Sequence, residues 1–419
     1  MFKNRWWVLG ASFFGNIVGP GPVLVFAYAV LLRPATQALG VDRSIFSSAS
    51  LVATMVGLIA QPATGWLIDR YGARMIMVPS VLLFALGVSA NSLLTANAAV
   101  IYLLFVCGNL FSGPASPLAF SIVIARWFDQ MRGLALGIAL AGIGVGTAVV
   151  PQFAAYLVAH DGWRSAYLGI AAAVVVFSWL PVVLFIREPP IFAQRRAQDK
   201  KKPVSDHLPG MTAREAFRHW RWWSLTIAFF LGGVSINGTL AHVVALLGDR
   251  GVPIQVAASS LAFAGIALIL GRVIAGWALD RFNGPLIAAF CFAVPILGIL
   301  MLASGTGGLT FARTATTLCG LGIGAEVDLM AFFLSRYCGL KAYGKIYGVS
   351  FACFNLGNTV GALIGSLSFD HLHSYTPAFL FFAGSLLVAC ILLLTLGAYA
   401  YPARREATLA AGDPEEATA

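Results

Sequence analysis

The sequence contains few charged residues. Only 11% of its 419 residues are Asp, Glu, Lys or Arg, whereas soluble globular proteins carry roughly 25%. Hydrophobic residues make up 59% of the chain, and the mean hydropathy is +0.84. This composition excludes an ordinary soluble protein and is typical of a chain that crosses a membrane repeatedly.

The sequence also lacks the motifs of several enzyme classes. Its six Cys are scattered singly, without a CxxC pair, so we interpret them as small apolar side chains rather than metal ligands. No HExxH, GxSxG or GxxxxGK[ST] motif is present, which argues against a zinc peptidase, a serine hydrolase and an ATP-driven pump. We therefore expect a protein that is not an enzyme and that uses no metal and no cofactor.

Long apolar stretches recur along almost the whole chain. A helix needs about 20 apolar residues to cross a bilayer, and only helices satisfy their own backbone groups within one such segment. The sequence therefore predicts an all-α membrane protein with twelve transmembrane helices. Their approximate ranges are 6–32, 44–68, 74–95, 98–125, 133–159, 164–186, 222–247, 255–279, 285–304, 309–335, 344–369 and 376–401.

A basic segment divides these helices into two sets of six. Residues 187–221 are rich in Lys and Arg, and we interpret them as a cytoplasmic linker that contacts anionic lipid headgroups rather than nucleic acid. The predicted parts are an N-terminal half (1–186), the linker (187–221), a C-terminal half (222–401) and a disordered cytoplasmic tail (402–419).

The basic residues also predict the orientation. With both termini inside, most of the 27 Lys and Arg residues fall on the cytoplasmic side, as the positive-inside rule requires. We expect a multi-pass protein of the bacterial inner membrane with both termini in the cytoplasm.

The two halves repeat each other at a constant offset of 211 residues. Gly65-Trp-Leu-Ile-Asp69-Arg70 aligns with Gly276-Trp-Ala-Leu-Asp280-Arg281. The same offset aligns Gly113 with Gly324, and the Gly residues at 133, 137 and 146 with those at 344, 348 and 357. Duplicated halves with a site between them are typical of secondary transporters.

The segment Gly65-x-x-x-Asp69-Arg70-x-Gly72-x-Arg74 resembles the loop 2–3 signature of the major facilitator superfamily. The resemblance implies two pseudo-symmetric six-helix halves and a gating role for this motif. Its expected residues are Gly65, Asp69, Arg70, Gly72 and Arg74, with Gly276, Asp280 and Arg281 in the second copy.

Within that superfamily, Arg126-Trp-Phe-x-x-x-Arg132-Gly-Leu-Ala-Leu-Gly resembles the bacterial monocarboxylate transporter and oxalate:formate exchanger branch, as does Gly324-Ala-Glu-x-Asp328. The resemblance implies transport of a small organic anion, with a proton or in exchange. Two positions differ from that branch: Leu268 replaces an Asp of the animal monocarboxylate transporters, and Phe354 replaces a second cation of the oxalate exchangers.

Arg272 is the basic residue that lies deep inside a predicted span, away from its ends. It precedes Asp280 by eight residues, or about 12 Å along a helix. A charge at that depth is costly and marks a candidate functional site, and the planar guanidinium matches a carboxylate. Its counterpart in the first half is the uncharged Gln61. Arg272 therefore either binds an anion or forms a structural pair with a helix carboxylate.

Glu326 and Asp328 are acidic residues deep in the tenth span. Two residues apart on a helix, they point about 200° apart, so we expect them to have different partners. One of them either pairs with Arg272 or takes up a proton, and the other braces helix packing.

Other polar or aromatic residues lie at useful depth. Pro20-Gly21-Pro22 and the segment 112–117 predict interruptions in the first and fourth spans, and interrupted helices often line transport sites. The candidate substrate-binding residues, besides Arg272, are Asn16, Phe26, Tyr28, Ser116, Asn237, His242 and Asn355. The alternative for each polar one is a hydrogen bond between helices.

These observations predict a secondary active transporter that moves a small, monocarboxylate-like organic anion by alternating access, with a proton. The alternatives are an anion exchanger without proton coupling and an exporter of a neutral solute or drug. The expected partners are the anion, a proton and membrane lipid, with no nucleic acid, and the expected state is a monomer.

Overall fold

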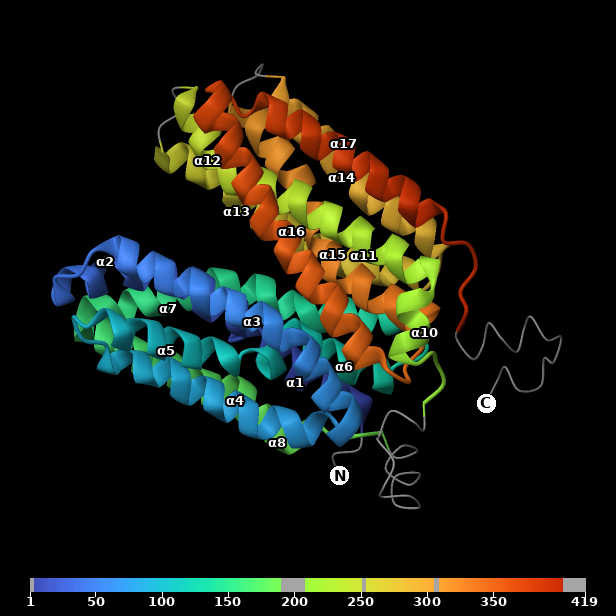
Figure 1. The fold of residues 1–419 in the computed structure, drawn as a ribbon, viewed down its shortest axis with the longest axis horizontal. Helices are drawn as coiled ribbons and strands as arrows, with labels where there is room; N and C mark the ends of the chain where they lie inside the picture. The colour runs from blue at the N-terminus through green and yellow to red at the C-terminus, as the bar shows by residue number, and fades with distance from the viewer. Residues whose placement is uncertain (1–3, 190–207, 251–253, 305–308, 402–419) are drawn as a thin grey trace. The chain divides into compact units, whose positions relative to one another are not determined.

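A computed structural model describes residues 4–189, 208–250, 254–304 and 309–401 (Figure 1). Most of the basic linker and the tail from 402 to 419 lie outside these ranges, so the predicted disorder of the tail stays a prediction. The described chain is helical, and its one strand-like pairing is an isolated bridge between Gly210 and Gly339.

The helices of each half follow one another in order along the chain. Their bounds are α1 (Arg5–Ile17), η1 (Gly21–Ala27), α2 (Tyr28–Leu39), α3 (Arg43–Tyr71), α4 (Ala73–Ala90), η2 (Asn91–Leu93), α5 (Ala98–Leu110), η3 (Gly113–Ala115), α6 (Pro117–Trp127), α7 (Arg132–Val174), η4 (Val175–Trp179), α8 (Leu180–Phe185), α10 (Ala213–Arg218), α11 (Trp220–Gly232), η6 (Gly233–Asn237), α12 (Gly238–Asp249), α13 (Ile254–Leu279), α14 (Gly284–Ala303), α15 (Leu309–Tyr337), α16 (Tyr343–Leu372) and α17 (Thr376–Leu394).

Ten continuous helical runs in the described ranges are long and apolar enough to cross a membrane. One of them, Arg132–Phe185, contains two spans joined at Gly162, which adopts a φ of 81° that favours glycine. A further span is split into α5 and α6 by the 3₁₀ turn η3. These segments make up the twelve spans, so the predicted twelve-helix fold is confirmed.

Two predicted interruptions are present. After Pro20 the first span continues as the π-helix η1, which has one extra residue per turn relative to an α-helix. The fourth span breaks at Gly113–Ala115, beside Pro117. Proline removes a backbone donor and clashes with the preceding turn, so both breaks have a local cause.

The residues fall into two units by their contacts. Unit 1 comprises Met1–Trp127, Ile138–Pro209 and Lys341–Gly348, and unit 2 comprises Phe128–Gly137, Gly210–Leu340 and Val349–Ala419. Each unit therefore includes a short segment from the other half of the sequence. These two segments contain the first turns of α7 and of α16.

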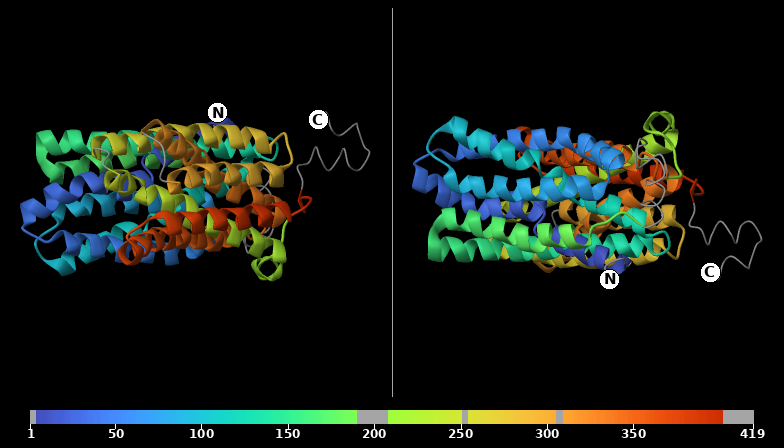
Figure 2. Two further views of the ribbon diagram at one scale, coloured as in Figure 1. Left: turned by 90° about the horizontal axis from the view of Figure 1, so that it is seen from above. Right: turned by 90° about the horizontal axis from the view of Figure 1, so that it is seen from below.

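Within each unit the long helices run side by side, as both views of Figure 2 show. In unit 1, α3 packs along α5, and in unit 2, α15 packs along α13 and α14. α15 is the most enclosed span, with 78% of its most apolar 18-residue window buried. Any charged side chain on its inner turns is therefore held away from solvent.

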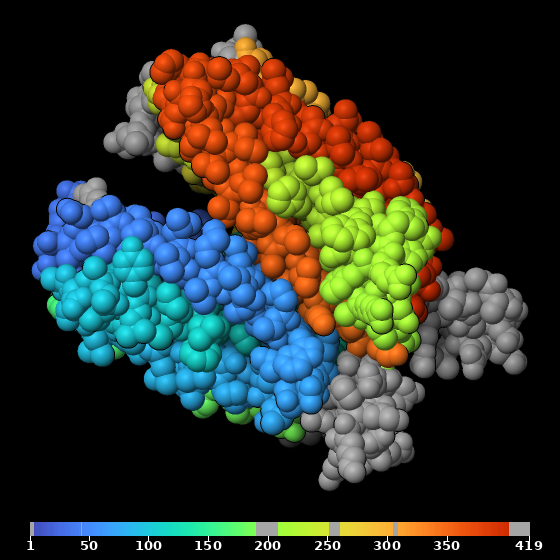
Figure 3. All heavy atoms as spheres, in the orientation of Figure 1, coloured from blue at the N-terminus to red at the C-terminus, as the bar shows by residue number. Residues whose placement is uncertain are grey.

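Large apolar side chains cover the outer faces of the helices. Ile59 is 79% exposed and Phe290 is 67% exposed. In Figure 3 the side chains of α11, in yellow-green, lie on the surface beside α16, in orange. Exposed apolar side chains on membrane-spanning helices are suited to contact with lipid.

Candidate functional site

Arg272 and Asp328 form a buried ion pair in unit 2. The Nη1 atom of Arg272, on α13, lies 2.7 Å from Oδ1 of Asp328, on α15, and the two side chains are 4% and 1% exposed. Taking two charges out of water costs free energy that the pair recovers only with close geometry. Of the two acids on α15, Asp328 is thus the one that neutralises Arg272.

Glu326 has a different, uncharged partner. Asn237, the last residue of the π-helix η6, donates from Nδ2 to Oε2 of Glu326 at 3.3 Å. Glu326 is 1% exposed. The two acids therefore contact different neighbours, as their spacing on one helix predicts.

The hydrogen-bonding capacity of this cluster is incompletely used. Among the described residues, Oε1 of Glu326, Oδ2 of Asp328 and Nε of Arg272 are buried and have no hydrogen-bond partner. A buried, unsatisfied polar group costs roughly 1–3 kcal/mol. The cluster consequently has acceptors for a proton and a donor for an anion.

The remaining polar candidates of unit 2 make contacts between or along helices. The Nε2 atom of His242 lies 2.8 Å from the Ala362 carbonyl, and its ring stacks on Tyr375. Asn355 donates to the Phe351 carbonyl, one turn earlier on α16. The structure does not bring these two side chains into the hydrogen bonds of the Arg272–Asp328 pair.

Three candidates of unit 1 are likewise placed apart. Asn16 is fully buried and donates to the carbonyls of Ser12 and Ala139. Ser116 donates to the Gly113 carbonyl within the break of the fourth span, and Phe26 is 46% exposed. Asn16 and Ser116 thus satisfy backbone groups.

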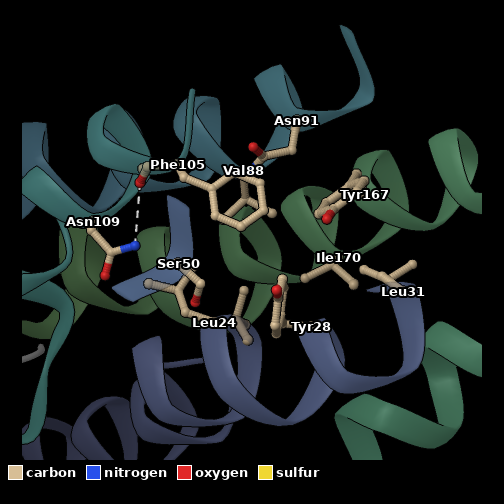
Figure 4. A pocket seen from close by; sticks show the side chains of 12 residues that line it. Leu24, Tyr28, Leu31, Ser50, Val88, Asn91, Phe105, Asn109, Tyr167 and Ile170 are labelled. Carbon is tan, nitrogen blue, oxygen red and sulfur yellow. Dashed lines mark hydrogen bonds between the residues drawn. The ribbon is translucent and has the colours of Figure 1, made fainter. Parts of the chain in front are cut away.

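Tyr28 lines a cavity of about 30 Å³ inside unit 1 (Figure 4). Figure 4 shows the hydroxyls of Tyr28 and Tyr167 directed into the same space, with Asn91 and Phe105 above it. The cavity has room for about two water molecules. Its full lining is Val23, Leu24, Tyr28, Leu31, Ser50, Val88, Asn91, Phe105, Gly108, Asn109, Tyr167 and Ile170.

This cavity contains no charged side chain in its lining. The buried Oδ1 of Asn91 has no hydrogen-bond partner among the described residues. The sequence singles out Tyr28 but not Asn91 or Tyr167, because each of these is a single residue near the end of a span and no local pattern marks it.

The duplicated signature forms the same hydrogen bonds twice. Asp69 accepts from the backbone amides of Gly344 at 3.0 Å and Lys345 at 2.9 Å, all within unit 1. Asp280 accepts from Gly133 and Leu134, each at 2.8 Å, within unit 2. Each carboxylate thus caps the first turn of a helix, where free amides and the helix dipole favour an anion.

Glycines allow these close approaches. A Cβ atom on Gly65 would collide with the Gly344 carbonyl, and one on Gly276 would collide with the Gly133 carbonyl. Gly72 begins the turn into α4 with a φ of 90°, and Arg74 is half-buried in the first turn of that helix. The conformation at Gly72 favours glycine.

The basic residues of the signature lie over aromatic rings. The guanidinium of Arg70 is 5.4 Å from the ring centroid of Trp66, and that of Arg281 is 4.6 Å from Trp277. The two pairs occupy equivalent positions of the repeat. Cation–π contacts of this length are attractive.

The two copies differ in what surrounds the carboxylate. Arg126 bonds Asp69 through Nη2 and Glu188 through Nη1, both at 3.1 Å, and Glu188 also accepts from the Ala73 amide. The equivalent positions in the second half are Tyr337 and Tyr399, whose ring centroids are 5.4 Å apart. No local pattern marks Glu188, because it is the second residue of the basic linker, just beyond the sixth span.

Asp280 lies just beyond the end of α13. Burial raises the pKa of its carboxyl above the ordinary range, against the opposing effect of the Leu134 and Gly133 amides.

Residues 10–358 match the sequence profile described as Major Facilitator Superfamily. Similar proteins include the uncharacterized MFS-type transporter YcxA of Bacillus subtilis, 26% identical over 83% of this chain and 85% of that protein. Monocarboxylate transporter 13 of Bos taurus is 25% identical over 93% of this chain and 89% of that protein.

The 4-hydroxybenzoate transporter PcaK of Pseudomonas aeruginosa is 25% identical over 79% of each chain. Among solved structures, a variant of the Escherichia coli fucose:proton symporter FucP is similar with a TM-score of 0.73 at 15% identity, covering 95% of this chain and 100% of that chain. At that identity the structural similarity concerns the fold alone.

Proposed function

The chain belongs to the major facilitator superfamily, and from that premise we propose that it is a secondary transporter that carries a small organic anion, with a proton, across the bacterial inner membrane. The observation that carries the anion class is Arg272. It is a guanidinium inside a membrane span, only 3% exposed, and its uncharged equivalent is Gln61. A charge at this depth that the other half of the repeat lacks marks a candidate anion site, and its bond to Asp328 is the contact that an arriving anion would replace.

Similar proteins support the substrate class. Monocarboxylate transporter 13 and the 4-hydroxybenzoate transporter PcaK are named for carboxylates. The guanidinium fork of Arg272 binds a single carboxylate through two parallel hydrogen bonds. We therefore favour a monocarboxylate or an aromatic acid over a dicarboxylate, because Phe354 stands where the oxalate exchangers have a second cation.

The Arg272–Asp328 pair supplies the coupling. Asp328 occupies one edge of the guanidinium at 2.7 Å, so an arriving carboxylate competes with it. Protonation of Asp328 removes its charge and frees Arg272 for the substrate. The second acid, Glu326, has one oxygen without a partner among the described residues and serves as a further proton acceptor.

The signature residues act in gating under this proposal. Asp69 and Asp280 each hold the first turn of a distant helix through two backbone amides. Releasing and reforming these bonds accompanies alternating access. The basic linker and both termini lie in the cytoplasm, where the positive-inside rule and anionic lipid headgroups place them, and the working unit is a monomer.

The cavity of unit 1 has no charged side chain in its lining, but it has room for only about two water molecules, so it does not by itself favour an organic solute. The alternatives to a proton-coupled anion transporter are an anion exchanger without proton coupling and an exporter of a neutral solute or drug.

Uptake into proteoliposomes tests these functions. The purified chain is reconstituted and given labelled lactate, benzoate, 4-hydroxybenzoate or glycerol, with and without an inward proton gradient. The proposal expects saturable uptake of at least one acid that the gradient drives. Arg272→Gln should abolish it, and the exposed Arg33→Gln should not. Uptake of glycerol alone, or undiminished acid uptake by Arg272→Gln, would contradict the anion class.

A further inference from the structure

Spans 1 and 7 contain π-helical segments at equivalent places of the repeat. η1 covers Gly21–Ala27, and adding the offset of 211 gives 232–238, which includes η6 (Gly233–Asn237). A further π-helix of the described residues, η4 (Val175–Trp179), differs, since its equivalent in span 12 lies inside the continuous helix α17. π-helices are rare and concentrate at functional sites. The matched pair, η1 and η6, is therefore a candidate for a functional role that the two halves share, whereas η4 is not.

The π-helix of span 7 ends on an acid of the proposed coupling site. Its last residue, Asn237, donates to Oε2 of Glu326 at 3.3 Å. Two glycines at the start of this segment let span 7 approach α15 and α16 closely. A Cβ on Gly232 would stand 3.0 Å from Oε1 of Glu326, and one on Gly233 would collide with Oδ1 of Asn358. The segment is thus packed between Glu326 of α15 and Asn358 of α16.

The surroundings of Glu326 leave Asn237 as its hydrogen-bond partner within the described residues. Arg272 of α13 attracts Glu326 electrostatically but is bonded to Asp328. From α14, the ring of Phe292 faces it across Gly232, and the Cys291 thiol interacts with Asp328. The hydrogen bond from Asn237 is therefore stronger when Glu326 is ionised than when it is protonated, because a bond to a carboxylate is roughly twice as strong as one between neutral groups.

We propose that Asn237 is a positioning residue through which the protonation of Glu326 controls the π-helix of span 7, and thereby the outer part of that span. This inference rests on the proposed transport function. A π segment holds one residue more than the α-helix that would replace it. Converting η6 to an α-helix turns the following residues by about 100° and shifts them by about 1.5 Å. That movement withdraws Asn237 from Glu326, so the two changes are linked.

Amide hydrogen exchange tests the link without a substrate. The full-length chain in lipid nanodiscs is compared as wild type, Asn237→Leu, Glu326→Gln and the double variant. Asn237→Leu should speed exchange at residues 233–241 about tenfold, as loss of a hydrogen bond to a charged group implies. Glu326→Gln should give a smaller increase. The π-helix η4 is the internal control, and its exchange should not change.

The double variant separates positioning from packing. If Asn237 acts through Glu326, the double variant should exchange no faster than Asn237→Leu alone, because the two changes remove one interaction. Additive increases would overturn the proposal, as would unchanged exchange at 233–241 or equal increases at η4. These outcomes are independent of the transport assay, so the failure of one proposal is distinguishable from failure of the other.

Matched deletions test the conformational step. Removing one residue from a π segment restores an α-helix and abolishes the change of register. Deleting Ser235 from η6 should therefore slow proton-driven uptake of the acid identified above at least tenfold while its binding persists, and it should suppress the exchange increase of Glu326→Gln. Deleting Ser178 from η4 should leave both properties unchanged. Normal exchange responses after deletion of Ser235 would overturn the inference.

Discussion

Asp280 holds the amides of Gly133 and Leu134 in the way that Asp69 holds those of Gly344 and Lys345. Every member of one set lies 211 positions from its equivalent in the other. The sequence repeat is therefore also a repeat of hydrogen bonds. It also shows that each half supplies the carboxylate for one copy and the helix start for the other.

Filling the glycines beside these carboxylates should impair transport. Gly65→Ala or Gly276→Ala places a Cβ against the carbonyl of Gly344 or Gly133, and overpacking of this kind costs about 1–3 kcal/mol. We expect the maximal rate of uptake to fall about tenfold or more. Gly10→Ala and Gly248→Ala are the controls, because nothing lies within 4 Å of the added carbon. Equal rates in all four variants would contradict the gating role.

Removing Arg126 should destabilise the protein more than removing its equivalent aromatic. Arg126→Gln leaves the buried carboxylate of Asp69 and the partly buried one of Glu188 without their cation, and an uncompensated buried charge costs about 3–5 kcal/mol. Tyr337→Phe removes only a hydroxyl that bonds the Gly397 carbonyl, at about 1 kcal/mol. Thermal unfolding in detergent should show the larger drop for Arg126→Gln, and the reverse order would refute this reading of the asymmetry.

Asp328→Asn should separate proton coupling from anion binding. The change removes the charge that pairs with Arg272 and mimics a permanently protonated acid. We expect exchange of internal for external anion to persist while a proton gradient no longer drives net uptake. Glu326→Gln should give the same pattern if it carries the proton. Accumulation against a gradient by both single variants and the double variant would return the acids to a structural role.

Arg272→Lys should restore little of the activity that Arg272→Gln loses. Lysine keeps the positive charge but not the planar fork that donates two parallel bonds to a carboxylate. The apparent affinity for the anion should remain about ten- to hundredfold weaker, as loss of a charge-assisted bond implies. Uptake measured over a range of anion concentrations checks this, and wild-type affinity in the lysine variant would argue that charge alone is recognised.

The stability of the protein should depend on pH through Asp280. Burial raises the pKa of its carboxyl in the folded state, so the folded state binds the proton more tightly than the unfolded chain. The contribution of this group is therefore greatest at low pH and is lost as the pH rises through the raised pKa. The melting temperature of wild type minus that of Asp280→Asn should be larger at pH 5 than at pH 8. A difference that stays constant or shrinks on acidification would contradict the burial effect.

Local sequence signals predicted the spans and their breaks more fully than the site. Prolines disclosed the interruption after Pro20, because their effect on a helix is local. The π-helix η6 gave no comparable signal, since Gly232 and Gly233 also occur in ordinary helix packing. The sequence did indicate Arg272, because a charged residue deep inside an apolar span stands out from its neighbours. Whether Glu326 or Asp328 pairs with it depends on how α15 is rotated against α13, which no spacing along α15 determines.

The two carboxylate contacts have the same geometry, but they can form at different stages of synthesis. When Asp280 leaves the ribosome, Gly133 and Leu134 have already been made, so this contact can form at once. Asp69 must remain without Gly344 and Lys345 until most of the chain has emerged, and unit 1 is incomplete until residues 341–348 arrive. A chain that stops before Lys341 would carry one contact and not the other, and the first carboxylate to be made is the last to be capped.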